Sequence, residues 1–370
     1  MTQLIHWIGY LVNWNRYLGK LRQTLVGALL LLVWQNSSAL VVLQYHHISE
    51  DTPAATRISP ARFSQHMTWL ADNQYSILSM EEFLVLLKKN ETLPDKAVVI
   101  TFDDGFTSLY SEAWPVLKKR GWPFTVFVNS QHHDEKNAQY MSWAQLREMA
   151  EAGVTIGNHS VSHSHMIRFQ QGEKQADWRK RMKQEVTLAQ KRIDKEVGRQ
   201  PKIFAYPFGE HNQALENLLA ELKYVAFAQH SGPIAEFDSL QALPRFPFGG
   251  IYGDINDFAL KAASLPMPLK EVTLVAQKNQ SLVDPLLPND AEKITLLISG
   301  ENAFLKRISC FYSGKPVTAD IRGDQLYVSA DVDIPVGRSR FNSTAPEKAR
   351  FYWLSKMLIR KNADGSWYKE

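Results

Sequence analysis

Val98-Val99-Ile100-Thr101-Phe102-Asp103-Asp104-Gly105-Phe106 is an apolar, largely β-branched run that ends in two adjacent carboxylates and a glycine. The apolar part predicts a buried strand. An unpaired charge costs several kcal/mol to bury, so two acids at the tip of a buried strand indicate a bound cation or a proton transfer. The structural alternative is a strand-to-helix turn in which Asp104 caps the next helix.

The two carboxylates can serve one site only if the chain turns directly after the strand. Successive side chains of a regular strand point to opposite faces, so Asp103 and Asp104 would diverge in an extended chain. Gly105 permits a sharp turn, because glycine adopts backbone conformations that other residues avoid.

A second stretch, residues 154–163, is another short apolar run that ends in polar residues, among them His159 and His163. On a helical turn, the i, i+4 spacing would place both imidazoles on one face. Two imidazoles and one carboxylate form a usual three-ligand set for catalytic zinc. A lone histidine pair is usually a surface accident, but a histidine pair and an aspartate pair at two strand tips favour a metal site.

The segments Thr101-Phe102-Asp103-Asp104-Gly105 and His159-Ser160-Val161-Ser162-His163 together resemble the motifs of the polysaccharide deacetylases of the NodB-homology type, carbohydrate esterase family 4. Tyr45-His46-His47-Ile48 and Phe204-Ala205-Tyr206-Pro207-Phe208-Gly209 strengthen the resemblance, which is greatest to the poly-N-acetylglucosamine deacetylases. It covers roughly Leu40 to Ile251.

The resemblance implies a role for each residue of these motifs. Asp104, His159 and His163 would be metal ligands, and Asp103 would be the general base. The Tyr206-Pro207-Phe208 segment would contact the substrate, and the backbone N–H of Phe208 would stabilise the oxyanion. Imidazole and carboxylate ligands suit zinc, with cobalt, nickel or iron as alternatives.

The sequence departs from the family pattern in two ways. Many members carry an arginine where Ala205 stands, and that arginine orients the base. Many also have a late Leu-x-His motif whose histidine protonates the leaving amine, whereas the last histidine of this chain is His230. Our candidate for the acid is His46, at the tip of the first predicted strand, ahead of His47 and His230. The other histidines are expected at the surface or rim of the site, including His132, His133, His165 and His211.

Predicted strands and helices alternate from Leu40 to about residue 264. Repeated βα units imply a parallel sheet with helices around it. Composition does not separate a doubly wound sheet from a barrel, but the resemblance implies a distorted (β/α)7-type barrel over residues 40–264. The polar motifs all follow predicted strands, which places them at the carboxyl ends where barrels of this kind carry their sites.

The pattern changes near Leu265-Pro266-Met267-Pro268, which we interpret as a linker. Short β runs separated by turn residues predict a small β-sandwich over residues 270–370. Cations beside aromatic residues in segments 337–341 and 350–353 suit a carbohydrate-binding surface, although core packing is the favoured interpretation. Relatives with a similar carboxyl-terminal part carry a second cysteine near Ser343, so the resemblance implies that Cys310 has lost a partner.

The amino-terminal residues 1–39 have the pattern of a signal peptide or anchor. An apolar run, residues 24–34, follows Lys20 and Arg22 and precedes the small residues Ser37-Ser38-Ala39. Without residues 1–39, the formal net charge of +4 falls to +1, which gives no reason to expect nucleic acid as a partner. We expect an exported protein, periplasmic or associated with the cell envelope, and held at a membrane if this segment is an anchor.

The resemblance implies a metal-dependent hydrolase that removes acetyl groups from an N-acetylglucosamine polysaccharide. The alternative is a metal-containing glycan-binding protein that has lost the acid. An intact Asp103 favours the enzyme, since a binding protein needs no base beside its metal. The sequence contains no His-Glu-x-x-His segment, which disfavours a zinc peptidase.

Overall fold

The computed structural model describes residues 39–89, 94–276, 281–282, 284–288, 291, 293–329 and 334–369. Residues 1–38 of the predicted signal peptide or anchor lie outside them. Among the described residues, no helix combines the length and the apolar character needed to cross a membrane.

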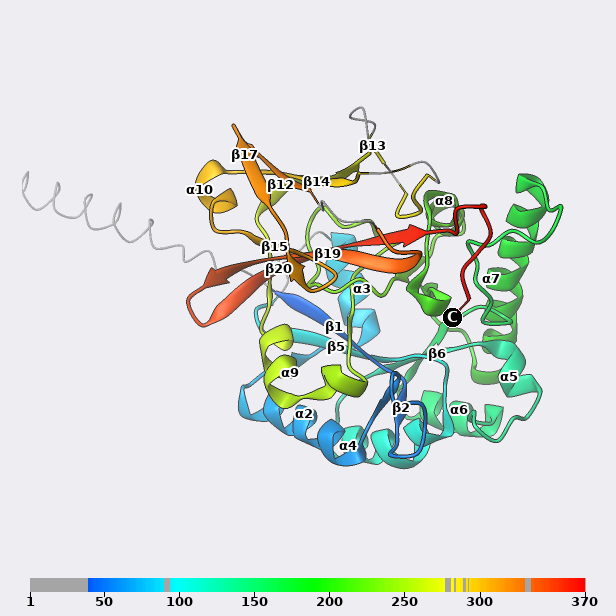
Figure 1. The fold of residues 1–370 in the computed structure, drawn as a ribbon. Helices are drawn as coiled ribbons and strands as arrows, with labels where there is room; N and C mark the ends of the chain where they lie inside the picture. Colours follow the sequence, from blue (N-terminus) through cyan, green and yellow to red (C-terminus); the bar gives the residue numbers. More distant parts are fainter. Residues whose placement is uncertain are drawn as a thin grey trace, which may run out of the picture. The chain divides into compact units, whose positions relative to one another are not determined.

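A parallel sheet forms the centre of the amino-terminal part, as the alternation of strands and helices predicts (Figure 1). The strands run in the order β10-β1-β5-β6-β7-β8-β9, and β4 pairs with β5. Their bounds are β1 Leu40–Tyr45, β4 Ser76–Ile77, β5 Ala97–Phe102, β6 Thr125–Val128, β7 Thr155–Asn158, β8 Ile203–Ala205, β9 Val225–Phe227 and β10 Phe246–Pro247. A parallel bridge from Phe227 to Leu243 also joins β9 to the segment that leads into β10.

The parallel arrangement explains the amino-acid composition of the neighbouring strands β1 and β5. Every residue of β1 and of β5 is buried, which fits apolar β-branched runs covered on both faces. Two short strands, β2 (His47–Ile48) and β3 (Arg57–Ile58), pair with each other beyond the end of β1.

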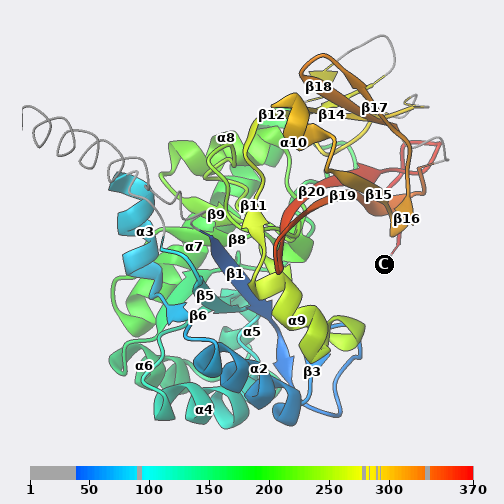
Figure 2. The ribbon, with the colours of Figure 1, turned by 90° about the vertical axis from the view of Figure 1, so that its left-hand side faces the viewer.

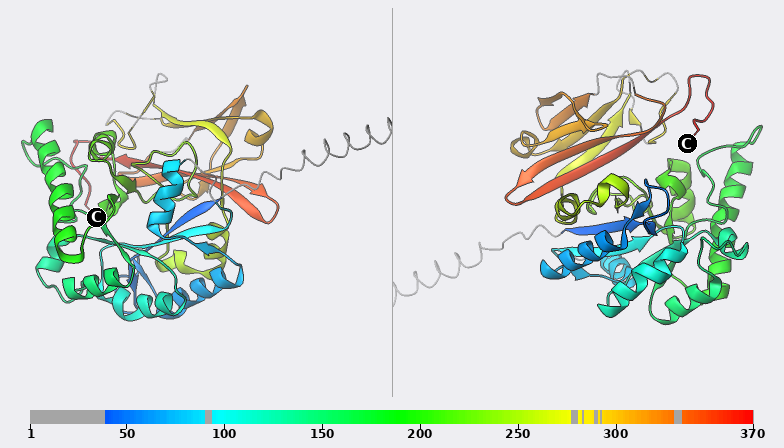
Figure 3. Two further views of the ribbon diagram at one scale, coloured as in Figure 1. Left: turned by 180° about the vertical axis from the view of Figure 1, so that it is seen from behind. Right: turned by 60° about the horizontal axis from the view of Figure 1, so that its bottom comes forward.

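Helices cover the outer side of this sheet. Figures 1 and 3 show them following one another around it from α2, coloured blue, through α4 and α6 to the green α7. Their bounds are α2 Pro60–Asp72, α3 Met80–Lys89, α4 Trp114–Lys119, α5 Ser130–Asp134, α6 Trp143–Glu151, α7 Gln175–Val197, α8 Gln213–Glu221 and α9 Ile255–Ala262.

The helix starts follow the capping chemistry of the sequence. The Ser59 hydroxyl accepts a hydrogen bond from the backbone of Arg62 at the start of α2. Ser142 and Gln145 form a reciprocal capping box at the start of α6. Such caps satisfy backbone N–H groups that have no acceptor within the helix.

The carboxyl-terminal part contains two five-stranded sheets, β11-β20-β19-β15-β16 and β13-β12-β14-β18-β17. Figure 2 shows them as separate layers, and apolar side chains from both share one core. The bounds are β11 Leu265–Pro266, β12 Leu269–Val275, β13 Ser281–Leu282, β14 Thr295–Gly300, β15 Ser309–Tyr312, β16 Lys315–Pro316, β17 Ala319–Arg322, β18 Gln325–Ser329, β19 Gly337–Glu347 and β20 Arg350–Arg360, with a short helix, α10, at Asn302–Leu305. The β-rich character of this region is confirmed.

The predicted linker is wrong in part, because Leu265–Pro266 forms β11 and pairs in parallel with β20. Two of the aromatic residues that suited a sugar surface, Phe341 and Tyr352, are buried in the shared core. Arg350 hydrogen-bonds the Ala263 carbonyl and Asp95 of the amino-terminal part. Core packing therefore accounts for Phe341 and Tyr352, whereas the Phe351 side chain is exposed.

Candidate active site

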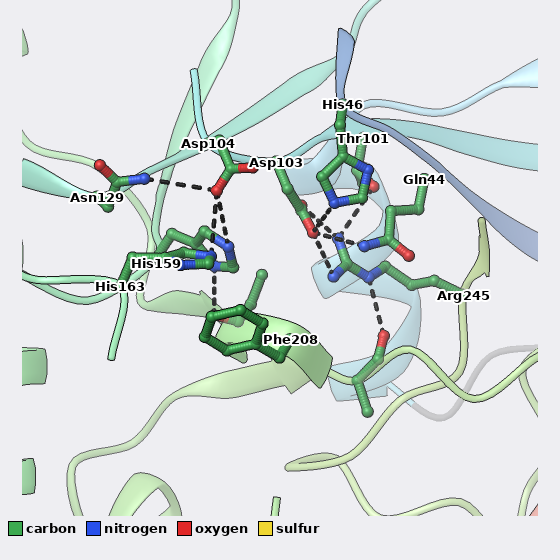
Figure 4. Close-up of polar contacts among 12 residues, drawn as sticks. Gln44, His46, Thr101, Asp103, Asp104, Asn129, His159, His163, Phe208 and Arg245 are labelled. Carbon is green, nitrogen blue, oxygen red and sulfur yellow. Dashed lines mark hydrogen bonds and ion pairs between the residues drawn. The ribbon is translucent and has the colours of Figure 1, made fainter. Parts of the chain in front are cut away.

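The polar motifs of the sequence meet at the carboxyl ends of the parallel strands (Figure 4). Asp103 and Asp104 follow β5, and His159 and His163 follow β7. Phe208 follows β8, in the 3-10 turn η2 (Pro207–Gly209). Because parallel strands end at one edge of the sheet, residues far apart in the sequence converge there.

The turn after β5 has the sharpness that Gly105 was expected to permit. Asp104 has φ of 71° and Gly105 has φ of 75°. A Cβ atom at Gly105 would lie 2.8 Å from Cε1 of His133, so no larger residue fits without a shift. The turn directs both carboxylates into the site. Asp104 contacts two imidazoles and does not act as the helix cap that was the structural alternative.

Three side chains form a candidate metal site. Oδ1 of Asp104 lies 3.4 Å from Nε2 of His159 and 3.2 Å from Nε2 of His163. One donor atom from each residue falls within 4.8 Å of the others. Nδ1 of His159 is hydrogen-bonded to the Ala205 carbonyl at 2.7 Å. That bond fixes the tautomer and leaves the Nε2 lone pair free for a metal, so this donor set fits a divalent cation.

The expectation of a helical turn between the two histidines is wrong. Residues 159–163 form a loop in which Ser160 and His163 have φ of 71° and 53°. Glu185 of α7 holds the loop, because its Oε2 accepts hydrogen bonds from the N–H groups of Val161 and Ser162 at 3.0 and 2.9 Å. The loop, rather than helical periodicity, brings the imidazoles together.

Two of the three side chains, Asp104 and His163, have the charge state that metal binding requires. Burial alone raises the pKa of Asp104, but the neighbouring histidines His159 and His163 hold it well below its usual range. Burial and the neighbouring His159 lower the pKa of His163 to about 4. Burial also lowers the pKa of His159, but the carboxylates of Asp104 and Asp103 outweigh it and leave that pKa raised. A carboxylate and a neutral imidazole are the forms that coordinate metals.

Asp103 is completely buried, and its carboxylate accepts three hydrogen bonds from two residues. Arg245 forms a bidentate ion pair with it, with Nη1–Oδ1 at 2.7 Å and Nη2–Oδ2 at 2.8 Å. Nε2 of Gln44 donates to Oδ2 at 2.6 Å. Burial raises the pKa of Asp103, but the Arg245 guanidinium together with His159 and His46 outweighs it and keeps that pKa below its usual value. The carboxylate is therefore ionised and fixed in position.

Arg245 is the residue that sequence reasoning missed. The family's arginine is missing at Ala205, but Arg245 reaches the base from just before β10. A signal was present in the sequence: a charged residue stands inside the apolar run from Leu243 to Phe248. A fully buried arginine requires an anionic partner, and Asp103 is the strand-tip carboxylate that was not expected to bind the metal.

His46 lies beside the base, with Nε2 at 4.0 Å from Oδ2 of Asp103 and its side chain 16% exposed. The other two acid candidates are placed differently. His47 stacks on Phe106 with ring centroids 3.5 Å apart, and burial with the adjacent His46 lowers its pKa to about 4. His230 is buried beside His211, at 6.1 Å between ring centroids. Of these three histidines, His46 is the one whose imidazole lies beside the Asp103 carboxylate.

The expectation that the remaining histidines lie at the surface or rim of the site fails for His66, which is fully buried, and for two others. His133 is buried and its Nδ1 is hydrogen-bonded to the Met141 carbonyl at 2.7 Å. His211 is also buried, and its Nδ1 lies 2.9 Å from Glu216. Both have structural partners that the sequence spacing did not indicate.

The segment Tyr206-Pro207-Phe208 splits into a core residue and a site residue. The Tyr206 side chain is buried and its hydroxyl donates to the Gln241 carbonyl at 2.8 Å, so that ring serves the core. Phe208 adopts φ of 58° and its ring centroid lies 4.7 Å from that of His163. Phe208 is the member of the segment beside the candidate metal ligands.

Comparison with known proteins indicates which class of protein residues 90–227 resemble. Residues 90–227 match the family model described as polysaccharide deacetylase. Over residues 90–227, the chain is therefore similar to the polysaccharide deacetylases.

Individual relatives show which members of this class the chain resembles. The chain is 31% identical over 179 residues to the protein YxkH of Bacillus subtilis, a match that covers 48% of this chain and 60% of that protein. It is 25% identical over 244 residues to the poly-beta-1,6-N-acetyl-D-glucosamine N-deacetylase of Escherichia coli K12, covering 56% of this chain and 36% of the enzyme. The solved structure of IcaB from Ammonifex degensii is 25% identical, with a TM-score of 0.54, and covers 61% of this chain and 98% of its own. The chain thus matches less than two thirds of each of these two curated relatives.

Proposed function

We propose that this protein is a metal-dependent hydrolase that removes acetyl groups from an N-acetylglucosamine-containing polysaccharide. The observation that carries the proposal is the ionised Asp103, fixed by Arg245 and Gln44 beside the three converging donors of Asp104, His159 and His163. A protein that only binds glycan gains nothing from a buried carboxylate maintained at this cost in desolvation. The match of residues 90–227 to the polysaccharide deacetylase family model supports the same conclusion.

Amide hydrolysis needs a stronger nucleophile than water and a more polarised carbonyl than a free amide offers. A divalent metal held by Asp104, His159 and His163 would supply both, by lowering the pKa of water and polarising the carbonyl. Zinc suits this donor set, as do cobalt, nickel and iron. Asp103 accepts the proton of the water that attacks the acetamide carbon, and its ion pair with Arg245 orients it for that task.

The remaining groups act on the oxyanion and the leaving amine. The backbone N–H of Phe208 stabilises the negative charge that develops on the carbonyl oxygen. His46 donates a proton to the amine nitrogen as the carbon–nitrogen bond breaks, which gives acetate and a free glucosamine unit.

Within this class, we propose poly-β-1,6-N-acetylglucosamine as the first substrate to test. The support is the match to an enzyme with that name in Escherichia coli, over 56% of this chain. We also propose that the protein is exported to the periplasm or cell envelope, where such a polymer would be found. The two carboxyl-terminal sheets are proposed to form a sandwich that assists glycan binding. Sequencing the amino terminus of the mature protein tests the export.

The experiment is acetate release from a panel of N-acetylglucosamine polymers by metal-stripped protein reloaded with zinc. Asp103→Asn is the test variant, and Asp320→Asn, which alters an exposed ion pair with Arg322, is the matched control. We expect metal-dependent release by the wild type and the control, and a loss of at least about 100-fold in Asp103→Asn. Stoichiometric metal without release from any polymer would establish the glycan-binding alternative.

A further inference from the structure

The turn that carries Phe208 has a demanding conformation. Phe208 is a non-glycine residue with φ of 58°, and Gly209 follows with φ of 69°. A Cβ atom at Gly209 would lie 2.4 Å from Cβ of Gln229, so the chain passes too close for any side chain. The turn is closed by the N–H of Gly209 on the Tyr206 carbonyl at 2.8 Å. A left-handed residue costs about 1–3 kcal/mol and persists only when its surroundings hold it.

Glu210, directly after the turn, is a fully buried carboxylate with partners on both oxygens. Oε2 lies 2.8 Å from Nδ1 of His165, and Oε1 accepts a hydrogen bond from the Tyr368 hydroxyl at 2.5 Å. Nη2 of Arg168 is 3.6 Å from Oε1. His165 also stacks on the ring of Phe208, with centroids 3.8 Å apart. The carboxylate therefore connects the carboxyl-terminal tail to the Phe208 ring.

The tail itself is held in place by several contacts. Nη1 of Arg168 donates to the Tyr368 carbonyl at 3.1 Å. The Arg168 guanidinium also lies over the rings of Trp367 and Tyr368, at 5.1 and 4.8 Å from their centroids. Tyr368 Cδ2 would be 4.0 Å from a Cβ at Gly337, the first residue of β19. Figure 1 shows the red carboxyl-terminal segment descending beside α7 and α8.

A second contact comes from the start of β19. Nη1 of Arg338 donates a hydrogen bond to the carbonyl oxygen of Phe208. A donor on that carbonyl fixes the plane of the peptide that follows Phe208. Tyr368 acts two residues after Phe208, on the side chain of Glu210. Two separate segments of the carboxyl-terminal region thus hold the turn on its carboxyl-terminal side.

We propose that Tyr368 and Arg338 are positioning residues, through which the carboxyl-terminal region aligns the Phe208 N–H with the developing oxyanion. The proposal rests on the deacetylase function proposed above, and it assigns the β-rich region a part in the reaction in addition to any role in glycan binding. Oxyanion donors act at about 2.7–3.1 Å, and a displacement of 1 Å can cost about 100-fold in rate. The effect should fall on the chemical step and leave substrate binding unchanged.

The test compares Tyr368→Phe with Tyr327→Phe. Each variant removes one hydroxyl group from the carboxyl-terminal region, but the Tyr327 hydroxyl donates to Gln325 within β18. With zinc-loaded protein, we expect Tyr368→Phe to lower kcat about 10- to 100-fold with KM within twofold of wild type, and Tyr327→Phe to change neither. Arg338→Met should lower kcat in the same way.

A second readout does not depend on activity. Hydrogen exchange of the peptide spanning residues 206–211 reports the stability of the turn, because the N–H groups of Gly209 and Glu210 close it. We expect faster exchange there in Tyr368→Phe, with peptides of β1 and β5 unchanged, and no change in Tyr327→Phe. Unchanged exchange, or a kcat loss that is equal in the two variants, would overturn the proposal. If the wild type released no acetate, the deacetylase function would fail, and exchange alone would decide whether the tail holds the turn.

Discussion

The guanidinium group of Arg245 forms a bidentate ion pair with the carboxylate of Asp103, and neither side chain is exposed to solvent. The two residues are 142 positions apart. They meet because β5 and β10 flank the same strand, β1, and the short β10 pairs with Leu43 and Gln44 near the carboxyl end of β1, close to the end of β5. The charge that gives the base its ionised state thus comes from the last strand of the parallel sheet.

Removing Arg245 should destabilise the protein strongly. Arg245→Met leaves the Asp103 carboxylate buried without a countercharge, a change that costs about 3–5 kcal/mol. Arg245→Lys should recover only part of this, because an ammonium group cannot pair with both carboxylate oxygens at once. Denaturant unfolding at pH 7 measures both losses, and acetate release should fall in each.

A double-mutant cycle separates the ion pair from other effects of the substitution. Combined with Asp103→Asn, Arg245→Met should cost much less than the sum of the two single changes, since no buried charge remains. Arg322→Met, which breaks an exposed pair with Asp320, is the control and should barely move the unfolding midpoint. Additive losses at Asp103 and Arg245 would contradict the coupling.

Asn129 should tune the affinity for metal. Its Nδ2 lies 3.5 Å from Oδ1 of Asp104, the carboxylate oxygen that both histidines approach. Outer partners of this kind are worth about 10- to 100-fold in metal affinity, so Asn129→Ala should weaken zinc binding within that range. Removing a ligand, as in His163→Ala, should cost more. Competition with a chromogenic chelator gives the dissociation constants, and equal affinity of Asn129→Ala and wild type would exclude this role.

His66 should make stability depend on pH. It is fully buried between Tyr45 and the Gly253 carbonyl, each at 3.1 Å, and burial lowers its pKa to about 4. The unfolded chain binds a proton near pH 6.5, but the folded protein does not until about pH 4. The contribution of neutral His66 to the free energy of unfolding is therefore complete above pH 6.5 and is lost as the pH falls toward 4. At pH 5 the loss is about 2 kcal/mol.

The matched variant for this prediction is His66→Gln, which cannot titrate. Unfolding free energies at pH 7.5 and pH 5.0 should differ by about 2 kcal/mol less in the variant than in the wild type. The other histidines contribute equally to both proteins and cancel in the comparison. The same pH slope in both proteins would show that His66 is not the group responsible.

Ser343→Cys should create a disulfide with Cys310. The two residues are direct partners on β15 and β19, and the Ser343 hydroxyl donates to Sγ of Cys310 at 3.2 Å. Closing a loop of this length typically stabilises a protein by about 2–4 kcal/mol. Burial raises the pKa of Cys310 to about 11, so oxidation should be slow at neutral pH and need a catalyst or alkaline conditions.

Thiol titration and thermal unfolding check the crosslink. The oxidised variant should have no free thiol and a raised Tm, and reduction should return its Tm to that of the wild type. Two titratable thiols after complete denaturation of the oxidised sample would show that the geometry does not permit the bond.

The sequence predicts the parts of the site that depend on local chemistry. Asp103, Asp104 and Gly105 were placed at a strand tip because an apolar run ending in acids has few structural explanations. Their convergence with His159 and His163 followed from the topology of parallel strands. The Ser59 and Ser142 helix starts followed from hydrogen bonds that span three residues.

The parts that escaped prediction depend on contacts between distant segments. Arg245 reaches Asp103 across the sheet, and Glu185 orders the histidine loop from the middle of a helix. Neither contact has a fixed spacing that a single sequence could reveal. The i, i+4 spacing of the histidines was interpreted as helical because periodicity describes regular structure, whereas this loop is fixed by side chains outside it.

The position of Arg245 also matters while the protein is being made. Strands β1 and β5 leave the ribosome long before it does, so the growing chain holds an open sheet edge and a carboxylate with no countercharge. Arrival of the segment from Leu243 to Pro247 supplies the missing ladder partners of β1 and the missing cation together. A product cut short before that point keeps an exposed edge strand, the feature that promotes aggregation and chaperone capture. The pairing of β1 and the environment of Asp103 therefore cannot be completed until the segment that carries Arg245 has been synthesised.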